Sequence, residues 1–145
     1  MPPSNEASEP AVLVLGVKGF LEGESRLLRL GEELIVGRGR AADLSVKRAP
    51  KFTARPDRLE LARSERFLSV SRRHVRIQFL HPGLVEIEDL SSNGTFVDGR
   101  RVDRVGLTDL RARPHDINLG GVELLRLEWR GTPPGSPPPP GKPIL

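Results

Sequence analysis

Three short polar clusters in this chain combine the groups that bind a phosphate monoester. They are Gly-Arg at 37–38, Ser-Arg-Arg-His at 71–74, and Asp-Leu-Ser-Ser-Asn-Gly-Thr-Phe-Val-Asp-Gly at 89–99. A phosphothreonine carries a charge of about −1.5 to −2 and three acceptor oxygens. Guanidinium groups supply fixed charge and forked donors, and hydroxyl groups can donate to the same oxygens. The clusters therefore predict a protein that recognises phosphorylated protein.

The place of each polar residue in its cluster suggests a role. Arg38 follows a glycine at the end of an apolar run, where glycine lets the chain turn and lets a ligand backbone approach. Ser71 stands at the start of another apolar run and can donate its hydroxyl to a phosphate oxygen, and Arg72 and Arg73 flank it. Asn93 precedes a glycine, which is a strong turn signal, and its amide offers both a donor and an acceptor to a peptide backbone.

Positive charge is concentrated around these clusters. The 145 residues carry a net charge of +4, but residues 38–76 hold twelve Lys and Arg against four Asp and Glu, which leaves the rest of the chain net negative. Such a stretch suits an anionic partner, either nucleic acid or a phosphopeptide. With one Trp, no Tyr and no aromatic stacking motif in the basic stretch, nucleic acid is the less favoured partner.

The side chains do not form an arrangement typical of an enzyme. Asp89 and the two serines near it resemble a hydrolase dyad, but no Gly-x-Ser-x-Gly elbow or ordered Ser, His and Asp set accompanies them. There is no Cys, and His74 has no second ligand at metal-binding spacing, since His81 and His115 fall in predicted turns. We expect a structural, hydrogen-bonding His74 and a protein that is not an enzyme and uses no cofactor or metal.

The elements that must position the clusters are short and alternate between apolar and polar residues. Fourteen prolines and fifteen glycines argue against long helices. Alternation with turn signals every ~8–12 residues is typical of an all-β sandwich or barrel. Phe96 and Trp129 are predicted core residues. Strands are predicted within the apolar stretches 12–15, 27–30, 34–36, 75–80, 85–89 and 122–129.

One long basic stretch, residues 43–71, resists this interpretation. Residues 58–66 form either the start of a strand, because Leu59 and Leu61 alternate, or one short helix; we favour the strand, within a long loop. A loop of this length in a compact domain is usually functional or disordered. The basic run 47–51 is interpreted as a solvated loop, with contact to nucleic acid or an acidic peptide as the alternative.

The length suits one domain with a segment at each end. Residues 1–10 are expected to be a disordered leader without the basic region of a secretory signal, and residues 11–130 the domain. Residues 131–145 contain seven prolines and form a Pro-rich tail or linker, either a stiff spacer or a ligand for an aromatic groove. No stretch approaches the ~18 apolar residues of a membrane span, so a cytoplasmic protein without membrane contact is expected.

In this order, the clusters closely resemble the forkhead-associated (FHA) domain family, which reads phosphorylated motifs. The family pattern is a Gly-Arg pair, a Ser-x-x-His block and an Asn-Gly pair within Asp-Leu-x-Ser-x-Asn-Gly-Thr-x-Val-Asn-Gly. Asp98 stands where the family often has Asn. Residues 116–120 resemble the family's Asp-x-Ile-x-Leu-Gly strand, and His115 replaces a Gly, where only a changed turn is expected. The match covers about 11–129.

The resemblance implies an all-β, antiparallel sandwich of about eleven strands whose loops at one end bind phosphothreonine peptides. By this resemblance, Arg38 and Ser71 would contact the phosphate, and Arg72 or Arg73 would assist in binding it. Ser92 would contact the phosphate or the nearby peptide, and Asn93 the peptide main chain. Phosphopeptide binding is thus implied for Arg38, Ser71, Arg72, Arg73, Ser92 and Asn93. An architectural role is implied for Gly37, His74 and Gly94.

The spacing between the first two clusters exceeds the family's usual spacing, so an insertion of roughly 15 residues lies beside the site. It could add peptide contacts, cover the groove or mediate self-association. We expect a phosphothreonine-peptide-binding module, an adaptor in Ser/Thr kinase signalling and the N-terminal part of a larger regulator. The expected partner is a phosphothreonine-containing protein, either a Ser/Thr kinase or its substrate. The alternatives are a phospho-independent protein-assembly module and, less favoured, a nucleic-acid binder acting through residues 38–76.

Overall fold

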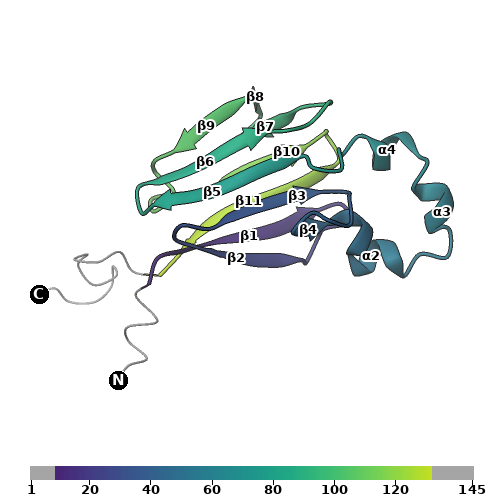
Figure 1. The fold of residues 1–145 in the computed structure, drawn as a ribbon, viewed down its shortest axis with the longest axis horizontal. Coiled ribbons are helices and arrows are strands. Elements are labelled where there is room, and N and C mark those ends of the chain that lie inside the picture. The colour runs from purple at the N-terminus through teal and green to yellow at the C-terminus, as the bar shows by residue number, and fades with distance from the viewer. Residues whose placement is uncertain (1–8, 132–145) are drawn as a thin grey trace, which may run out of the picture.

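Two β-sheets face each other in the computed structural model, which describes residues 9–131 (Figure 1). The six-stranded sheet has the order β2 (Ser25–Arg29), β1 (Ala11–Lys18), β11 (Glu123–Arg130), β10 (His115–Leu119), β7 (Thr95–Val97) and β8 (Arg100–Val102). The five-stranded sheet has the order β4 (Leu44–Ser45), β3 (Glu33–Gly37), β5 (Val75–His81), β6 (Leu84–Asp89) and β9 (Arg104–Leu107). The predicted all-β sandwich of about eleven strands is confirmed.

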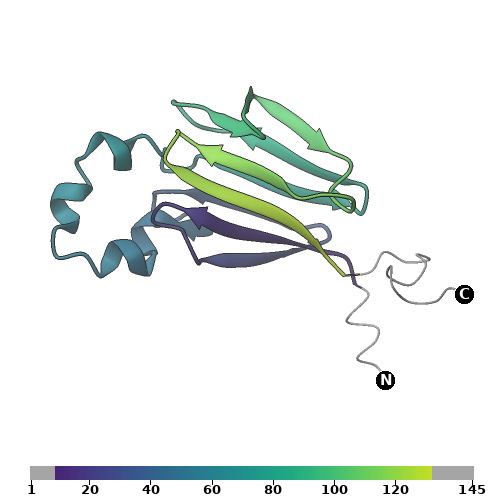
Figure 2. The ribbon, with the colours of Figure 1, turned by 180° about the vertical axis from the view of Figure 1, so that it is seen from behind.

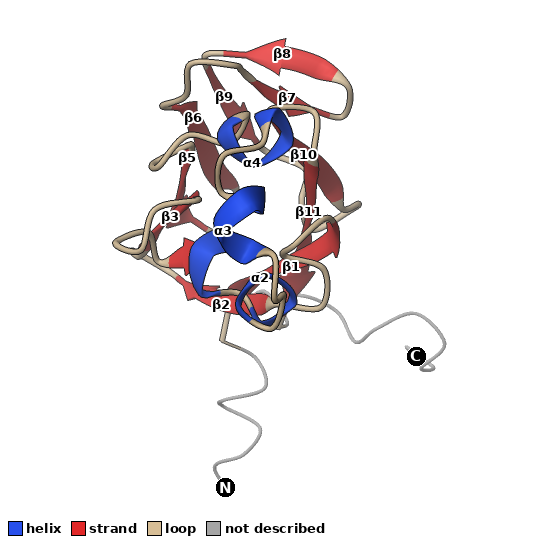
Figure 3. Ribbon diagram, turned by 90° about the vertical axis from the view of Figure 1, so that its right-hand side faces the viewer, coloured by secondary structure: helices blue, strands red, loops and turns tan. Residues whose placement is uncertain are grey.

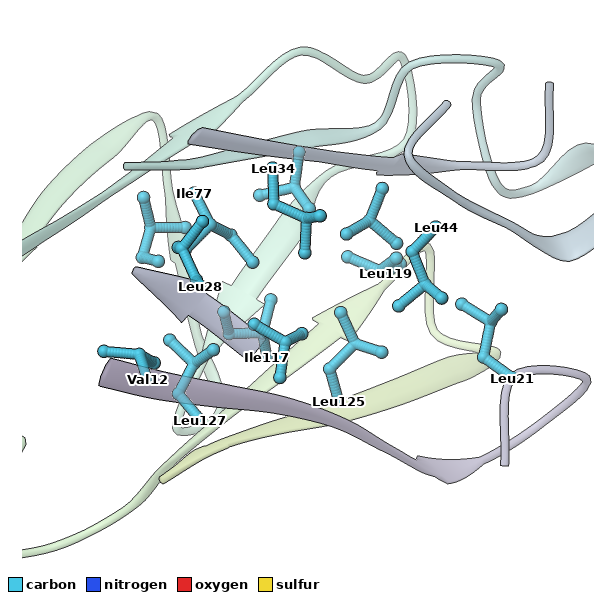
Figure 4. Packing of buried hydrophobic residues seen from close by; sticks show 14 of the residues in the cluster. Val12, Leu21, Leu28, Leu34, Leu44, Ile77, Ile117, Leu119, Leu125 and Leu127 are labelled. Carbon is cyan, nitrogen blue, oxygen red and sulfur yellow. The ribbon is translucent and has the colours of Figure 1, made fainter. Parts of the chain in front are cut away.

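The alternating residues of the strands supply the core between the two sheets. In β5, Val75, Ile77 and Phe79 are buried while the residues between them face outward. Figure 4 shows side chains from both sheets, among them Ile77 and Leu125, meeting in the space between them. Full burial of each such side chain stabilises the fold by about 1.5–3 kcal/mol. The two-residue period of the sequence thus determines which face of each strand packs.

The two aromatic residues predicted for the core behave differently. Trp129 is partly buried and packs edge-on against Phe79, with ring centres 5.8 Å apart. Phe96 is not a core residue, because Thr95 and Val97 occupy the two buried positions of the short strand β7 and leave Phe96 on its outward face. The prediction for Phe96 is therefore wrong.

After the two-residue strand β4, the insertion between the first two clusters forms short helices, with no strand in 58–66. It contains the 3-10 turn η1 (Val46–Arg48) and the one-turn helices α2 (Pro50–Thr53), α3 (Arg58–Leu61) and α4 (Glu65–Leu68). They lie across one end of the sandwich (Figure 3). The prediction of a strand within 58–66 is thus wrong. The backbone N–H groups of these residues bond to carbonyls three or four residues earlier, and the Ser64 hydroxyl accepts the Phe67 N–H as an N-cap. None of the helices in 9–131 is long and apolar enough to cross a bilayer.

Three phenylalanines attach the insertion to the sandwich. Phe52 of α2 packs edge-on against Phe20 in the β1–β2 loop, with ring centres 5.6 Å apart, and stacks on Phe67 of α4 at 5.0 Å. Phe52 and Phe67 are both buried. Aromatic pairs of these geometries add about 0.5–1.5 kcal/mol each beyond their burial. The insertion therefore has its own apolar anchor, continuous with the main core.

A buried carboxylate holds the β1–β2 loop beside this anchor. Glu123, the first residue of β11, accepts hydrogen bonds from Phe20 N–H at 2.9 Å and Leu21 N–H at 3.0 Å. Burial raises the pKa of Glu123, while these two N–H groups and the charge of Arg66 act in the opposite direction. Gly19 leaves room for the carboxylate, because a Cβ at this position would lie 2.4 Å from Glu123 Oε1.

His115 has a larger part in the fold than the changed turn expected from the sequence. It is the first residue of β10 and is buried, with Nδ1 2.5 Å from Asp98 Oδ2 and Nε2 2.6 Å from Asp109 Oδ1. Asp98 adopts a left-handed conformation, with φ of 50°. Hydrogen bonds from Arg113 and His115 lower the pKa of Asp109 to about 2. The prediction of a turn residue is corrected: His115 joins two loops at a buried strand end.

The strands place the two ends of the described chain at one end of the sandwich and the three clusters at the other. Ala11 of β1 pairs with Arg130 of β11, so the described chain enters and leaves side by side (Figure 2). The loops that follow β3 and β6, and the insertion that precedes β5, lie at the other end. Most of the predicted leader 1–10 and tail 131–145 lies outside the described residues.

Candidate functional site

The three clusters of the sequence meet at this loop end. Arg38 N–H donates to Ser71 O at 3.0 Å and Gly39 N–H to Arg72 O at 3.1 Å, which joins the β3–β4 loop to the second cluster. Ser92 N–H donates to Ser71 Oγ at 3.1 Å, which joins the third cluster to the second. Ser71 is thus bonded to both neighbouring loops.

Gly37 is required by the close approach of the first two clusters. A Cβ at this position would lie 2.1 Å from Arg72 O and 2.8 Å from Ser71 O, and both of these atoms belong to the backbone. Separations below 3.0 Å cannot be accommodated without moving one of the chains. The glycine therefore allows the residue that follows it, Arg38, to sit directly beside Ser71.

Among the residues that the structure describes, the Arg38 side chain is held in place without a counter-ion. Its guanidinium lies over the Phe67 ring, with Cζ 5.9 Å from the ring centre. Its Nε is buried and has no hydrogen-bond partner within residues 9–131. Burial and the nearby charge of Arg72 lower the pKa of Arg38, yet a guanidinium remains charged at neutral pH. A buried donor and two neighbouring positive charges together favour the binding of an anion.

His74 fixes the backbone of Ser71. Its Nδ1 accepts Ser71 N–H at 3.0 Å, and its Nε2 lies 2.8 Å from Gly94 O. Since Nδ1 accepts and a carbonyl can only accept, Nε2 must carry the hydrogen and the ring is neutral. Burial lowers the pKa of His74, against the opposing effects of Gly94 O and Asp89. With Ser71 Oγ already accepting from Ser92, the Ser71 hydroxyl hydrogen is left to donate to a ligand.

The remaining predicted binding residues are exposed around this centre. Arg72 and Arg73 point into solvent and make no ion pair within residues 9–131. Ser92 is also exposed. Asn93 Nδ2 donates to Ser69 O at 3.1 Å, so Oδ1 and one amide hydrogen are left for a peptide main chain. All six predicted binding residues therefore lie at one end of the sandwich, on connected loops.

Asp89 and Ser91 organise the third cluster. Asp89 Oδ1 accepts from Ser91 N–H at 3.0 Å, from Ser91 Oγ at 2.5 Å and from Thr95 Oγ1 at 2.8 Å. Ser91 Oγ in turn accepts Gly94 N–H at 2.8 Å. Burial acts to raise the pKa of Asp89, but these hydrogen bonds together lower it. The carboxylate thus fixes the loop that presents Ser92 and Asn93.

The comparison with known families agrees with this geometry. The sequence model of the FHA domain matches residues 34–117, which span all three clusters. The chain belongs to the FHA domain family. A search of curated proteins finds no match.

Solved FHA domains have the same architecture. The FHA domain of the CT664 protein from Chlamydia trachomatis is 26% identical, with a TM-score of 0.58 over 81% of this chain and 96% of that chain. An FHA domain studied for phosphothreonine-dependent interactions is 27% identical, with a TM-score of 0.54 over 81% and 95% of the two chains. The FhaA FHA domain, complexed with the intracellular domain of Rv3910, is 28% identical, with a TM-score of 0.51 over 82% and 99%.

Sequence reasoning missed two residues that shape this FHA site. Phe67, beneath Arg38, lies in α4, just after the stretch 58–66 for which a strand was favoured, and the sequence held no signal that it would approach Arg38. Ser69, whose carbonyl holds Asn93, acts through its backbone, which no residue pattern reveals. Both belong to the segment from α4 to Ser71, so this FHA domain uses its insertion to build part of the site.

Proposed function

We propose that this FHA domain binds phosphothreonine-containing peptides at its loop end. The observation that carries the proposal is the Arg38 guanidinium, which has a buried Nε without a partner, lies close to the charge of Arg72, and has no carboxylate paired with it in the described chain. A phosphate supplies both the missing acceptor and the missing negative charge. The related FHA domain with phosphothreonine-dependent interactions supports the same function.

In this proposal each exposed group has a role. Arg38 and the Ser71 hydroxyl bind the phosphate oxygens, and Arg72 or Arg73 adds charge from the rim. Ser92 contacts the phosphate or the adjacent peptide, and Asn93 Oδ1 accepts a peptide N–H. Gly37, His74 and Gly94 hold these groups in position. The domain would then act as a cytoplasmic adaptor for a Ser/Thr kinase or a kinase substrate.

The test is fluorescence-anisotropy binding to a peptide library built around phosphothreonine, with phosphoserine and unphosphorylated libraries as controls. Arg38→Ala and Ser71→Ala are compared with Arg29→Ala, an exposed arginine on β2. Each lost hydrogen bond to a charged phosphate is expected to cost about 1.5–3 kcal/mol, or roughly tenfold to a hundredfold in affinity. Arg29→Ala should bind like wild type.

Circular dichroism and thermal unfolding establish that each variant is folded. Wild-type affinity in both folded site variants would show that the phosphate lies elsewhere. Equal binding of phosphorylated and unphosphorylated libraries would overturn the proposed function itself.

A further inference from the structure

A second positively charged pocket lies on the insertion, outside the six proposed phosphopeptide residues. It has a volume of about 240 Å³, and its charged lining is Arg40 of the β3–β4 loop, Lys47 of η1 and Arg58 of α3. Thr53 adds a hydroxyl, while Phe52 and Leu59 provide an apolar wall. No Asp or Glu lines it. The pocket therefore combines the groups that bind an anion with a surface that binds an apolar side chain.

The charges around this pocket have no counter-ions in the described part of the chain. Within residues 9–131, Arg40, Lys47 and Arg58 take part in no ion pair, whereas two other cations of the insertion do: Lys51 with Glu22 at 3.2 Å and Arg55 with Asp57 at 3.0 Å. An isolated exposed cation is ordinary and indicates nothing. Three that line one concavity repel one another, and an anion placed among them removes that repulsion.

The pocket walls are joined before any ligand arrives. The Arg48 guanidinium of η1 donates to Arg40 O at 3.0 Å, to Ala42 O, and to Asp43 O at 3.2 Å. These bonds fasten the β3–β4 loop, which carries Arg40, to the turn that carries Lys47. A preformed pocket loses less conformational entropy when a ligand binds.

The pocket lies within reach of a peptide bound at the proposed phosphate site. Arg38 Cζ is 5.9 Å from the Phe67 ring centre, and that centre is 5.0 Å from the ring centre of Phe52, which lines the pocket. The Phe52 ring is therefore at most about 11 Å from the Arg38 guanidinium, which about three residues of extended peptide span. Because both rings are buried, a bound peptide follows a longer path over the surface, so more than three extended residues separate the two places.

We infer that this pocket binds a second anionic side chain of the same phosphothreonine peptide, with an apolar neighbour of that side chain packed against Leu59. The inference rests on the proposed function. Two arginines with forked donors suit either a phosphate or a carboxylate. Leu59 is 77% exposed in the free domain, more than Leu27, Leu30, Leu68 or Leu80, and an apolar ligand side chain would cover it. The preferred partner is thus doubly anionic, phosphorylated at a second residue or acidic there.

The test uses phosphothreonine peptides with otherwise neutral flanks. A phosphoserine, a Glu or a Gln is placed in turn at each position two to five residues to either side, and affinity is measured by anisotropy. At the best position, the peptide with phosphoserine or Glu should bind wild type at least fivefold more tightly than the peptide with Gln. Comparison of the phosphoserine peptide with the Glu peptide separates a phosphate pocket from a carboxylate pocket. Added salt should reduce the gain.

Variants of the domain test whether this gain in affinity comes from the pocket. Lys47→Gln and Arg58→Gln should lose it but bind the Gln peptide like wild type, whereas Arg63→Gln, an exposed arginine of the insertion that does not line the pocket, should keep it. A gain that is absent at every position, or that Arg63→Gln reduces as much as Arg58→Gln, would overturn the inference while leaving the proposed function intact. Failure of wild type to bind any phosphothreonine peptide would overturn both.

Discussion

The guanidinium of Arg38 rests on the ring of Phe67, with Cζ 5.9 Å from the ring centre. The two residues come from different parts of the sequence: Arg38 follows β3, and Phe67 belongs to the last helix of the insertion. A cation over an aromatic face gains about 0.5–1 kcal/mol when exposed and about 2 kcal/mol when desolvated. The insertion is therefore part of the support of the proposed phosphate-binding arginine, and several consequences can be measured.

Replacement of Phe67 should affect both stability and binding. Phe67→Ala removes a buried ring that stacks on Phe52, so the free energy of unfolding should fall by about 3–5 kcal/mol in urea titrations. Phe67→Leu is the milder change and keeps the domain folded for binding assays. It should weaken phosphopeptide binding because Arg38 loses the surface beneath it. Phe96→Leu, on the outward face of β7, is the matched control. Undiminished affinity in Phe67→Leu would show that Arg38 needs no such support.

Gly37→Ala should separate the first two clusters. The added methyl group would lie 2.1 Å from Arg72 O, so either β3 or the chain at Ser71 must move. Overpacking of this kind costs about 1–3 kcal/mol, and the phosphopeptide affinity should fall with the stability. Gly83→Ala in the β5–β6 turn is the control, because its Cβ would meet nothing closer than 3.6 Å. Thermal unfolding and anisotropy measure the two effects. Equal behaviour of the two variants would contradict the close approach at Gly37.

Stability should decline in acid because of His74. Burial lowers the pKa of His74 below its ordinary 6.5, so the unfolded chain takes up a proton at a pH where the folded domain does not. The contribution is fully present above pH 6.5 and is lost as the pH falls from there through the folded pKa. A protonated ring would also have to donate from Nδ1, which now accepts from Ser71 N–H.

The measurement is urea unfolding at several pH values below and above 6.5. The stability advantage of wild type over His74→Gln should shrink as the pH falls. His81→Gln, which changes an exposed histidine at the end of β5, should follow wild type at every pH. Stability is the better readout here, since the phosphate of the ligand itself titrates near pH ~6.

Glu123→Gln should destabilise the β1–β2 loop at neutral pH. The carboxylate accepts both Phe20 N–H and Leu21 N–H, whereas an amide offers one oxygen and turns its NH₂ group toward the other donor. A buried donor left unpaired costs about 1–3 kcal/mol. Glu22→Gln removes only an exposed ion pair with Lys51 and should cost less than about 1 kcal/mol. Equal losses in the two variants would show that the buried contacts contribute little.

The sequence predicted the long strands well but did not predict the secondary structure of the insertion. Strands such as β5 and β6 have alternating residues over six or seven positions, a signal long enough to assign. The α-helices of the insertion have four residues each, so the helical period does not repeat within them. The spacing of Leu59 and Leu61 was the only periodic signal there, and it favoured a strand. The buried position of His115 depends on Asp98 and Asp109, which come from two different loops.

The candidate site shows the same division. Arg38, Ser71 and Asn93 could be named because their side-chain chemistry occurs in short motifs, and the strands bring those motifs to one end. Phe67 could not be named, because its place beneath Arg38 depends on how three one-turn helices and the stacked Phe52 fold back on the sandwich. Short motifs are local, whereas the surfaces that support them are set by packing over long sequence separations.

The pairing of Ala11 with Arg130 has a mechanical consequence. These residues end the antiparallel strands β1 and β11 on the same side, away from the loops around Ser71. A force that pulls these two ends apart acts across the strands, so the hydrogen bonds of the ladder open one after another, as in a zipper, and are not loaded together in shear. The domain should therefore yield to tension at low force, and β1 should peel away from its Ala11 end before the loops that hold Arg38 are disturbed.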